Sequence, residues 1–168
     1  MDLGLKDKIA MVSGGSSGIG EAVAKGLAEE GTNVIIFSRN EPQLEMAAKR
    51  SKEGTGRAIR FLTADVTDQG DIDRLISKVI ATFHRIDFLV NAAGSGFPGE
   101  FESVSDEDWR KNFELNFFGT VRCSRGVLPY MRSQGGGNIV NIAAISAKQP
   151  RSSQIVSNAT KAAVLNFS

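Results

Sequence analysis

The sequence predicts an α/β fold built on a doubly wound parallel β-sheet. Short apolar segments alternate with longer amphipathic segments along all 168 residues. Most of the short segments are apolar throughout, which is typical of parallel strands covered by helices on both faces. Because no Pro- or Ser-rich linker interrupts this repeat, residues 1–168 are expected to form a single domain with right-handed strand–helix–strand connections.

Each predicted element has its own signature. The strands are expected at the short apolar segments, which cover residues 8–13, 33–38, 58–63, 87–91 and 138–143. The helices are expected between them, because apolar residues recur there three and four positions apart. The first helix has Ile19, Val23 and Leu27 on its apolar face, and Gly31 ends it. The remaining helical patterns lie at residues 44–48, 72–80, 106–131 and 154–168.

Composition and charge argue against several classes of protein. The formal net charge is +1, so neither nucleic acid nor an anionic membrane is expected as a partner. Cys123 is the sole cysteine, so no disulfide can form within the chain and a reducing, cytoplasmic compartment is expected. No apolar run approaches the roughly 20 residues that a membrane helix needs, and the first residues lack the apolar stretch of a signal peptide. No metal site is expected, because no cluster of residues has metal-ligand spacing.

A glycine-rich turn follows the first predicted strand, in the sequence SGGSSGIG at residues 13–20. Gly14, Gly18 and Gly20 follow a G-x-x-x-G-x-G spacing, and glycine allows both a tight turn and close approach of the backbone to a ligand. The N-terminal N–H groups of the next helix favour a pyrophosphate, and Ser16 and Ser17 can add hydroxyl donors. The alternative is a turn that only packs helix on strand. The position of the glycine-rich turn between a strand and a helix favours dinucleotide binding over this alternative.

Three more motifs follow in order: TADVTD at residues 63–68, NAAG at 91–94 and ELNFFGT at 114–120. With the glycine turn, they make the chain resemble the short-chain dehydrogenases/reductases along its whole length. Two positions depart from the family pattern, since Ser13 replaces a threonine and Ala92 an asparagine. The resemblance implies a Rossmann-type domain that is C-terminally incomplete, with five of the usual seven strands. It also implies a set of cofactor-binding residues, namely Gly14, Ser16, Ser17, Gly18, Ile19, Gly20, Arg39, Asp65, Val66, Asn91, Ala92, Ala93, Gly94 and Lys161.

The end of the second predicted strand indicates which dinucleotide is preferred. Proteins that prefer NAD usually carry an acidic residue there, but this chain has Ser38 followed by Arg39. An arginine can pair with a 2′-phosphate through two N–H groups, so NADP(H) is favoured over NAD(H). Arg39 could instead point into water or pair with Glu41. Ser17 also occupies a position at which many NADP(H)-preferring relatives carry a second basic residue.

The resemblance implies only part of the family's catalytic set. Its lysine falls on Lys161 and its asparagine on Asn116, but the tyrosine four residues before the lysine is Ser157 and the preceding serine is Ala144. An aliphatic hydroxyl is a much weaker acid than a phenol, whose reference pKa is about 10. Ser146, close to Ala144, and Ser157 are the remaining candidate donors. The other candidates in the chain have simpler explanations: Tyr130 and His84 are expected at helix ends, and residues 106–108 at a helix start.

The leading expectation is an NADP(H)-dependent oxidoreductase that acts on a small carbonyl compound or secondary alcohol, with weak or absent activity in this chain. The alternative is a non-catalytic dinucleotide-binding sensor or structural subunit. The resemblance also implies a homo-oligomer, because family interfaces correspond to the apolar stripes of residues 117–131 and 157–168. The sequence ends inside its last predicted helix, so part of a longer chain is favoured over a natural truncation.

Overall fold

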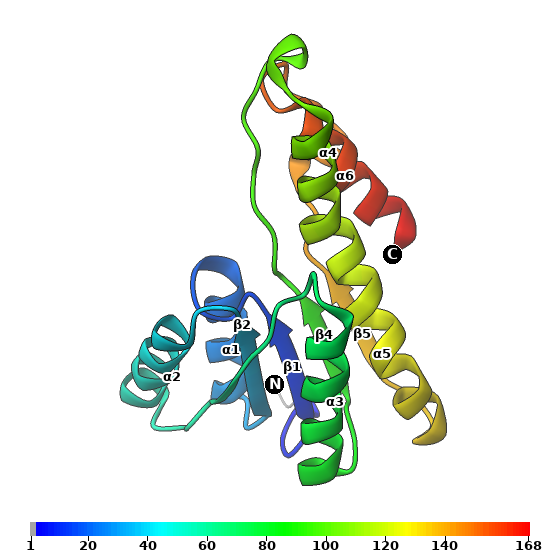
Figure 1. Ribbon diagram of the computed structural model, residues 1–168. Helices are drawn as coiled ribbons and strands as arrows, with labels where there is room; N and C mark the ends of the chain where they lie inside the picture. Colours follow the sequence, from blue (N-terminus) through cyan, green and yellow to red (C-terminus); the bar gives the residue numbers. More distant parts are fainter. Residues whose placement is uncertain (1–2) are drawn as a thin grey trace.

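The computed structural model describes residues 3–168 and contains the predicted parallel sheet, with its strands in the order β3-β2-β1-β4-β5 (Figure 1). The first two residues of the predicted domain lie outside this range. The chain runs outward from β1 through β2 to β3 and then returns to β4 on the other side of β1. Ligands of open α/β sheets bind at the carboxyl ends of the strands where the order reverses in this way. The strands are β1 (Ile9–Ser13), β2 (Asn33–Ser38), β3 (Arg60–Thr63), β4 (Phe88–Asn91) and β5 (Asn138–Asn141).

Helices cover both faces of the sheet, which explains why its central strands are apolar throughout. Met11 and Phe37 are buried in the layer that contains α3 and α5. Their strand neighbours Val12 and Ile36 point to the opposite face and are buried with α1 and α2. The helices are α1 (Gly18–Glu29), α2 (Glu41–Thr55), α3 (Gln69–Phe83), α4 (Asp106–Phe113), α5 (Gly119–Ser133) and α6 (Ile155–Phe167).

The structure differs from the prediction in two strands and in one helical region. The third and fifth strands are shorter than their apolar segments: Ile59 is buried against α1 and α2 but precedes β3, and the chain leaves β5 after Asn141. The helical region predicted at 106–131 is also not one regular helix. A π-helical turn, Glu114–Phe118, joins α4 to α5. Such turns insert an extra residue into a helix and often occur at functional sites.

Residues that sequence reasoning set aside as structural have structural roles. His84 ends α3 in the left-handed conformation, with φ of 60°, and is exposed. Tyr130 packs at the margin of the α3–α5 core. Ser105 and Asp108 form a capping box at the start of α4, where each accepts a hydrogen bond from the other's backbone N–H.

Some apolar surface stays uncovered at the β5 side of the sheet. β5 pairs with β4, and Val140 in its centre is 49% exposed. Phe118 and Leu128, within the stripe predicted as a subunit interface, are also exposed. Assembly into a homo-oligomer stays a prediction. Within residues 3–168, none of the helices combines the length and apolar character needed to cross a bilayer.

Candidate functional site

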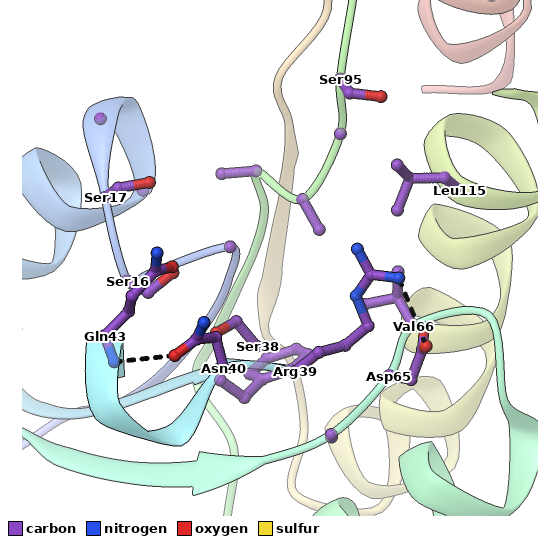
Figure 2. A pocket seen from close by; sticks show the side chains of 18 of the residues that line it. Ser16, Ser17, Ser38, Arg39, Asn40, Gln43, Asp65, Val66, Ser95 and Leu115 are labelled. Carbon is purple, nitrogen blue, oxygen red and sulfur yellow. Dashed lines mark hydrogen bonds and ion pairs between the residues drawn. The ribbon is translucent and has the colours of Figure 1, made fainter. Parts of the chain in front are cut away.

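A cavity of about 500 Å³ opens at the carboxyl ends of the strands, where the sheet order reverses (Figure 2). Five parts of the chain meet there: the glycine turn after β1, the start of α2 after β2, the loop after β3, the segment after β4 and the π-helical turn before α5. Most of the predicted cofactor-binding residues line this cavity. They are Gly14, Ser16, Ser17, Gly18, Ile19, Gly20, Arg39, Asp65, Val66, Ala92, Ala93 and Gly94. Asn91 and Lys161 lie outside the lining, as do the candidate donors Ser146 and Ser157.

The glycine turn brings its backbone against the segment after β4. Gly14 has φ of +64°, and a Cβ atom on it would lie 2.9 Å from Cα of Ala93. A Cβ atom on Gly20 would fall inside the contact distance of the Gly14 carbonyl oxygen. The serine at the N-cap of α1, Ser17, makes no side-chain capping hydrogen bond. The first N–H groups of α1 therefore face the cavity without a side-chain cap, as an anion site requires.

Two glycines of α1 give a matched test of this packing. We expect Gly20→Ala to destabilise the protein by about 1–3 kcal/mol, because the added methyl overlaps backbone that cannot move aside as a side chain can. We expect Gly26→Ala to stabilise it by about 0.5–1 kcal/mol, because nothing lies within 4 Å and alanine favours a helix interior. Chemical denaturation of both variants measures the difference. Equal shifts in the two midpoints would contradict the close approach of α1 to Gly14.

Ser13 joins β1 to the segment after β4. It is 1% exposed, and its hydroxyl oxygen accepts hydrogen bonds from the backbone N–H groups of Ala92 and Ala93, both at 3.0 Å. Asn91 is buried beside it and donates from its side-chain amide to Ser124 and Asn141, so it acts from behind the cavity wall. Sequence reasoning placed Ser13 in the glycine motif without giving it a role. Serine and the threonine that the family has at this position share a hydroxyl, and this hydroxyl could have indicated a hydrogen-bonding role for Ser13.

The corner of the cavity after β2 is polar and holds Arg39. Its guanidinium lies 3.8 Å from the Asp65 carboxylate and its side chain is 69% exposed (Figure 2). Arg39 thus pairs with Asp65 and not with Glu41, the partner considered from the sequence. Asn40 caps α2 by accepting a hydrogen bond from the Gln43 N–H at 3.0 Å. Sequence reasoning named Ser38 only as the residue in the acidic position, and it missed Asn40 and Gln43, which also line this corner.

The loop after β3 is fixed by its own hydrogen bonds. The Asp65 carboxylate accepts from the backbone N–H and the hydroxyl of Thr67, at 2.8 and 2.7 Å. Val66 is buried, and a Cβ atom on Gly119 would lie 2.8 Å from its Cγ2 atom. Leu115, from the π-helical turn, lines the cavity opposite the glycine turn and was not predicted (Figure 2).

Asn116 sits in the π-helical turn and supports the cavity wall from behind. It is 1% exposed; its Oδ1 accepts from the Ser95 N–H at 3.1 Å, and its Nδ2 donates to the Ser95 carbonyl at 3.2 Å. Nδ2 also donates to the Asn112 carbonyl at 3.0 Å. The side-chain amide oxygen and nitrogen of Asn116 thus both form hydrogen bonds with backbone groups.

Lys161 approaches the same wall from α6. Its Nζ donates to the Ile142 carbonyl at 3.0 Å, and a Cβ atom on Gly94 would lie 3.4 Å from Nζ and 2.5 Å from Oδ1 of Asn116. Burial lowers the pKa of the Lys161 ammonium, because partial removal from water disfavours its charged form. Lys161 and Asn116, distant in sequence, therefore meet at Gly94.

The candidate proton donors are less well placed. Ser157 is 6% exposed, and its hydroxyl oxygen accepts a hydrogen bond from the Phe97 N–H at 2.7 Å. Ser146 is 8% exposed, in a short 3-10 turn after β5. Ala144 is exposed just before that turn and has no hydroxyl. The structure thus brings Lys161 to the cavity wall but leaves both serines buried outside its lining.

Comparisons with known proteins agree with this geometry. The model of a family described as short chain dehydrogenase matches residues 8–168. An uncharacterized oxidoreductase of Staphylococcus epidermidis is 36% identical over 160 residues, which are 95% of this chain and 68% of the relative. A 2,3-dihydro-2,3-dihydroxybenzoate dehydrogenase of Bacillus subtilis is 37% identical over 164 residues, which are 98% of this chain and 62% of the relative.

Solved structures give the same picture. L-sorbose reductase of Gluconobacter frateurii, complexed with NADPH and L-sorbose, matches with a TM-score of 0.94 and 38% identity, over 100% of this chain and 64% of that one. An actinorhodin polyketide ketoreductase with NADPH matches with a TM-score of 0.92 and 33% identity, over 96% of this chain and 62% of that one. The chain thus spans somewhat less than two thirds of the length of these structures.

Proposed function

This chain belongs to the short chain dehydrogenase family, and on that premise we propose that it binds NADP(H), in preference to NAD(H), as the cofactor-binding part of an oxidoreductase for carbonyl compounds or secondary alcohols. The observation that carries the proposal is the meeting of the glycine turn with the segment after β4, beside Lys161 and Asn116. The glycine turn and the N-terminus of α1 would hold the pyrophosphate. Asp65 and Val66 would lie at the adenine, and Gly94 and Lys161 at the nicotinamide ribose.

The polar corner after β2 supports the choice of NADP(H). No carboxylate stands at the end of β2: its last residue is Ser38, whose buried hydroxyl has no hydrogen-bond partner among the described residues. The exposed guanidinium of Arg39 is available to a phosphate. Both solved relatives described above were crystallised with NADPH.

Arg39→Ala tests the cofactor preference. We expect NADPH affinity to fall by roughly five- to tenfold and NADH affinity to change much less, because the arginine is exposed and a solvated ion pair contributes only modestly. Calorimetric titration of the folded protein with each cofactor measures both affinities. Arg57→Ala, which removes another exposed positive charge away from the cavity, is the matched control. Equal losses for NADPH and NADH would overturn the role of Arg39.

The chemistry of the site is divided between the cofactor and the protein. When bound, the nicotinamide supplies or accepts the hydride, so the protein has to orient it and move a proton. Lys161 is placed to hold the ribose. The proton donor is the weak part of the site, because Ser157 replaces the family's tyrosine, Ala144 its serine, and the Ser157 oxygen already accepts a hydrogen bond from Phe97.

That hydrogen bond also favours the second candidate function, a dinucleotide-binding sensor or structural subunit without catalysis. The two candidates share the cofactor site and differ only in turnover. A cofactor-saturated sample of the full-length protein, incubated with a panel of ketones and aldehydes, distinguishes them. NADPH oxidation above the rate without protein supports the oxidoreductase, and binding without oxidation supports the sensor or subunit.

A further inference from the structure

We propose that Ser157 is a positioning residue whose hydroxyl holds the cavity wall at the nicotinamide end of the site, a role that rests on the proposed dinucleotide function. Residues 94–99 are called here the wall segment. Gly94, the last residue of the NAAG motif, and Ser95 line the cavity, and the rest of the segment leads out of it towards the start of α6. Ser157 would act through this segment and not by touching the cofactor.

The outer end of the wall segment lies on the start of α6. The Phe97 N–H donates to the Ser157 hydroxyl at 2.7 Å, and that hydroxyl can donate weakly to the Phe97 carbonyl at 3.5 Å. The Gly99 N–H donates to the Ser153 carbonyl at 2.9 Å, and Gly99 forms a parallel bridge with Gln154. Of these contacts, only the one to Ser157 uses a side chain of α6. It is therefore the only one of them that depends directly on which amino acid occupies position 157.

The inner end of the same segment is held from the other side. Asn116 binds both the N–H and the carbonyl of Ser95, which lines the cavity. Gly94 lies between Asn116 and the Lys161 ammonium. Two buried polar side chains, Asn116 and Ser157, therefore fix the backbone on each side of Gly96.

A serine suits this role better than the family's tyrosine would. Its short side chain places the hydroxyl oxygen 2.7 Å from the Phe97 nitrogen. A phenol oxygen at residue 157 would lie a whole ring further from the helix and could not accept the same hydrogen bond. The chain thus keeps a hydroxyl at this position and uses it to orient backbone.

Amide hydrogen exchange tests the contact without any cofactor. In Ser157→Ala, exchange at the Phe97 N–H should accelerate by about tenfold, because a partly buried donor loses its acceptor. The Ser95 N–H, held by Asn116, should change little, and Ser157→Thr should restore protection at Phe97. Ser153→Ala is the control, since Ser153 contributes only its backbone carbonyl. Unchanged exchange at Phe97 in Ser157→Ala would overturn the proposal.

Measurements of ligand affinity then test whether the contact between Ser157 and Phe97 positions the nicotinamide end of the site. We expect Ser157→Ala to weaken NADP⁺ by roughly three- to tenfold while leaving adenosine 2′,5′-bisphosphate, which lacks the nicotinamide half, unaffected. Ser157→Thr should recover most of the NADP⁺ affinity. Equal losses for both ligands, or no loss for either, would contradict the positioning role. If the unmodified protein binds neither ligand, the proposed function fails, whereas the exchange result for Phe97 still stands on its own.

Discussion

Replacing Ser157 by Tyr together with Ala144 by Ser should raise NADPH oxidation by at least about 100-fold in the full-length protein. A positioned general acid typically contributes 10²–10⁴-fold, and a hydrogen-bond donor to the developing oxyanion a further ~10²–10³-fold. Both act on the same oxygen, so they need not add. The variant also loses the hydrogen bond from Phe97, but that loss is expected to cost at most about tenfold. The gain in proton transfer therefore dominates.

The control for this experiment separates the ring from its hydroxyl. Ser157→Phe with Ala144→Ser fills the same space and breaks the same contact with Phe97, but has no acid at residue 157. Initial rates with a panel of ketones and aldehydes, at saturating NADPH, should rise only in the tyrosine variant. If the unmodified protein already matches that variant and Lys161→Ala abolishes its activity, another acid serves the site. Ser146, or Ser157 acting through water, would then be the first candidates.

Gly94→Ala is expected to give the second large effect, a loss of dinucleotide affinity of roughly 5- to 100-fold. The added methyl would lie 2.5 Å from Oδ1 of Asn116 and 3.4 Å from Nζ of Lys161. Asn116 cannot yield easily, because Ser95 and Asn112 hold its amide. Overpacking of this kind typically costs about 1–3 kcal/mol, and 1.4 kcal/mol is a factor of ten in affinity.

Gly96→Ala is the matched control, two residues further along the same segment. Nothing lies within 4 Å of a Cβ atom at Gly96, and its backbone is outside the left-handed region. Calorimetry with NADPH should therefore give near-normal affinity for this variant and a much weaker one for Gly94→Ala. Comparable affinities in the two variants would show that Gly94, Asn116 and Lys161 do not form one side of the site.

The fold could be predicted from sequence because its signals are local. A strand buried on both faces is a short apolar run, and β1 and β2 are such runs with partners from both helix layers. The glycine turn is equally local, since Gly14 and Gly20 pack against each other within one turn. The division of the helical region at the π-helical turn was not predicted, because the apolar pattern continues through Glu114–Phe118 without a break.

The contacts that define the site depend on where distant segments meet. Ser13 binds the N–H groups of Ala92 and Ala93 only because β1 and β4 are neighbours in the sheet. Ser157 was identified as the replacement for a tyrosine, but its hydrogen bond to Phe97 depends on the path of a loop that carries no sequence pattern. The sequence alone could therefore predict which family group this position lacks. It could not show what the replacement does.

Titration of the unmodified protein with NADP⁺, followed through its backbone amide spectrum, tests the central claim most directly. The claim predicts saturable binding with the largest shifts at the glycine turn, Arg39, Asp65 and residues 92–94, all of which border the same cavity. A second, more apolar cavity of about 560 Å³ lies between β3 and α3 and should show no shifts. Absence of saturable binding, or shifts centred on that second cavity, would contradict the claim that the reversal point of the sheet holds the dinucleotide.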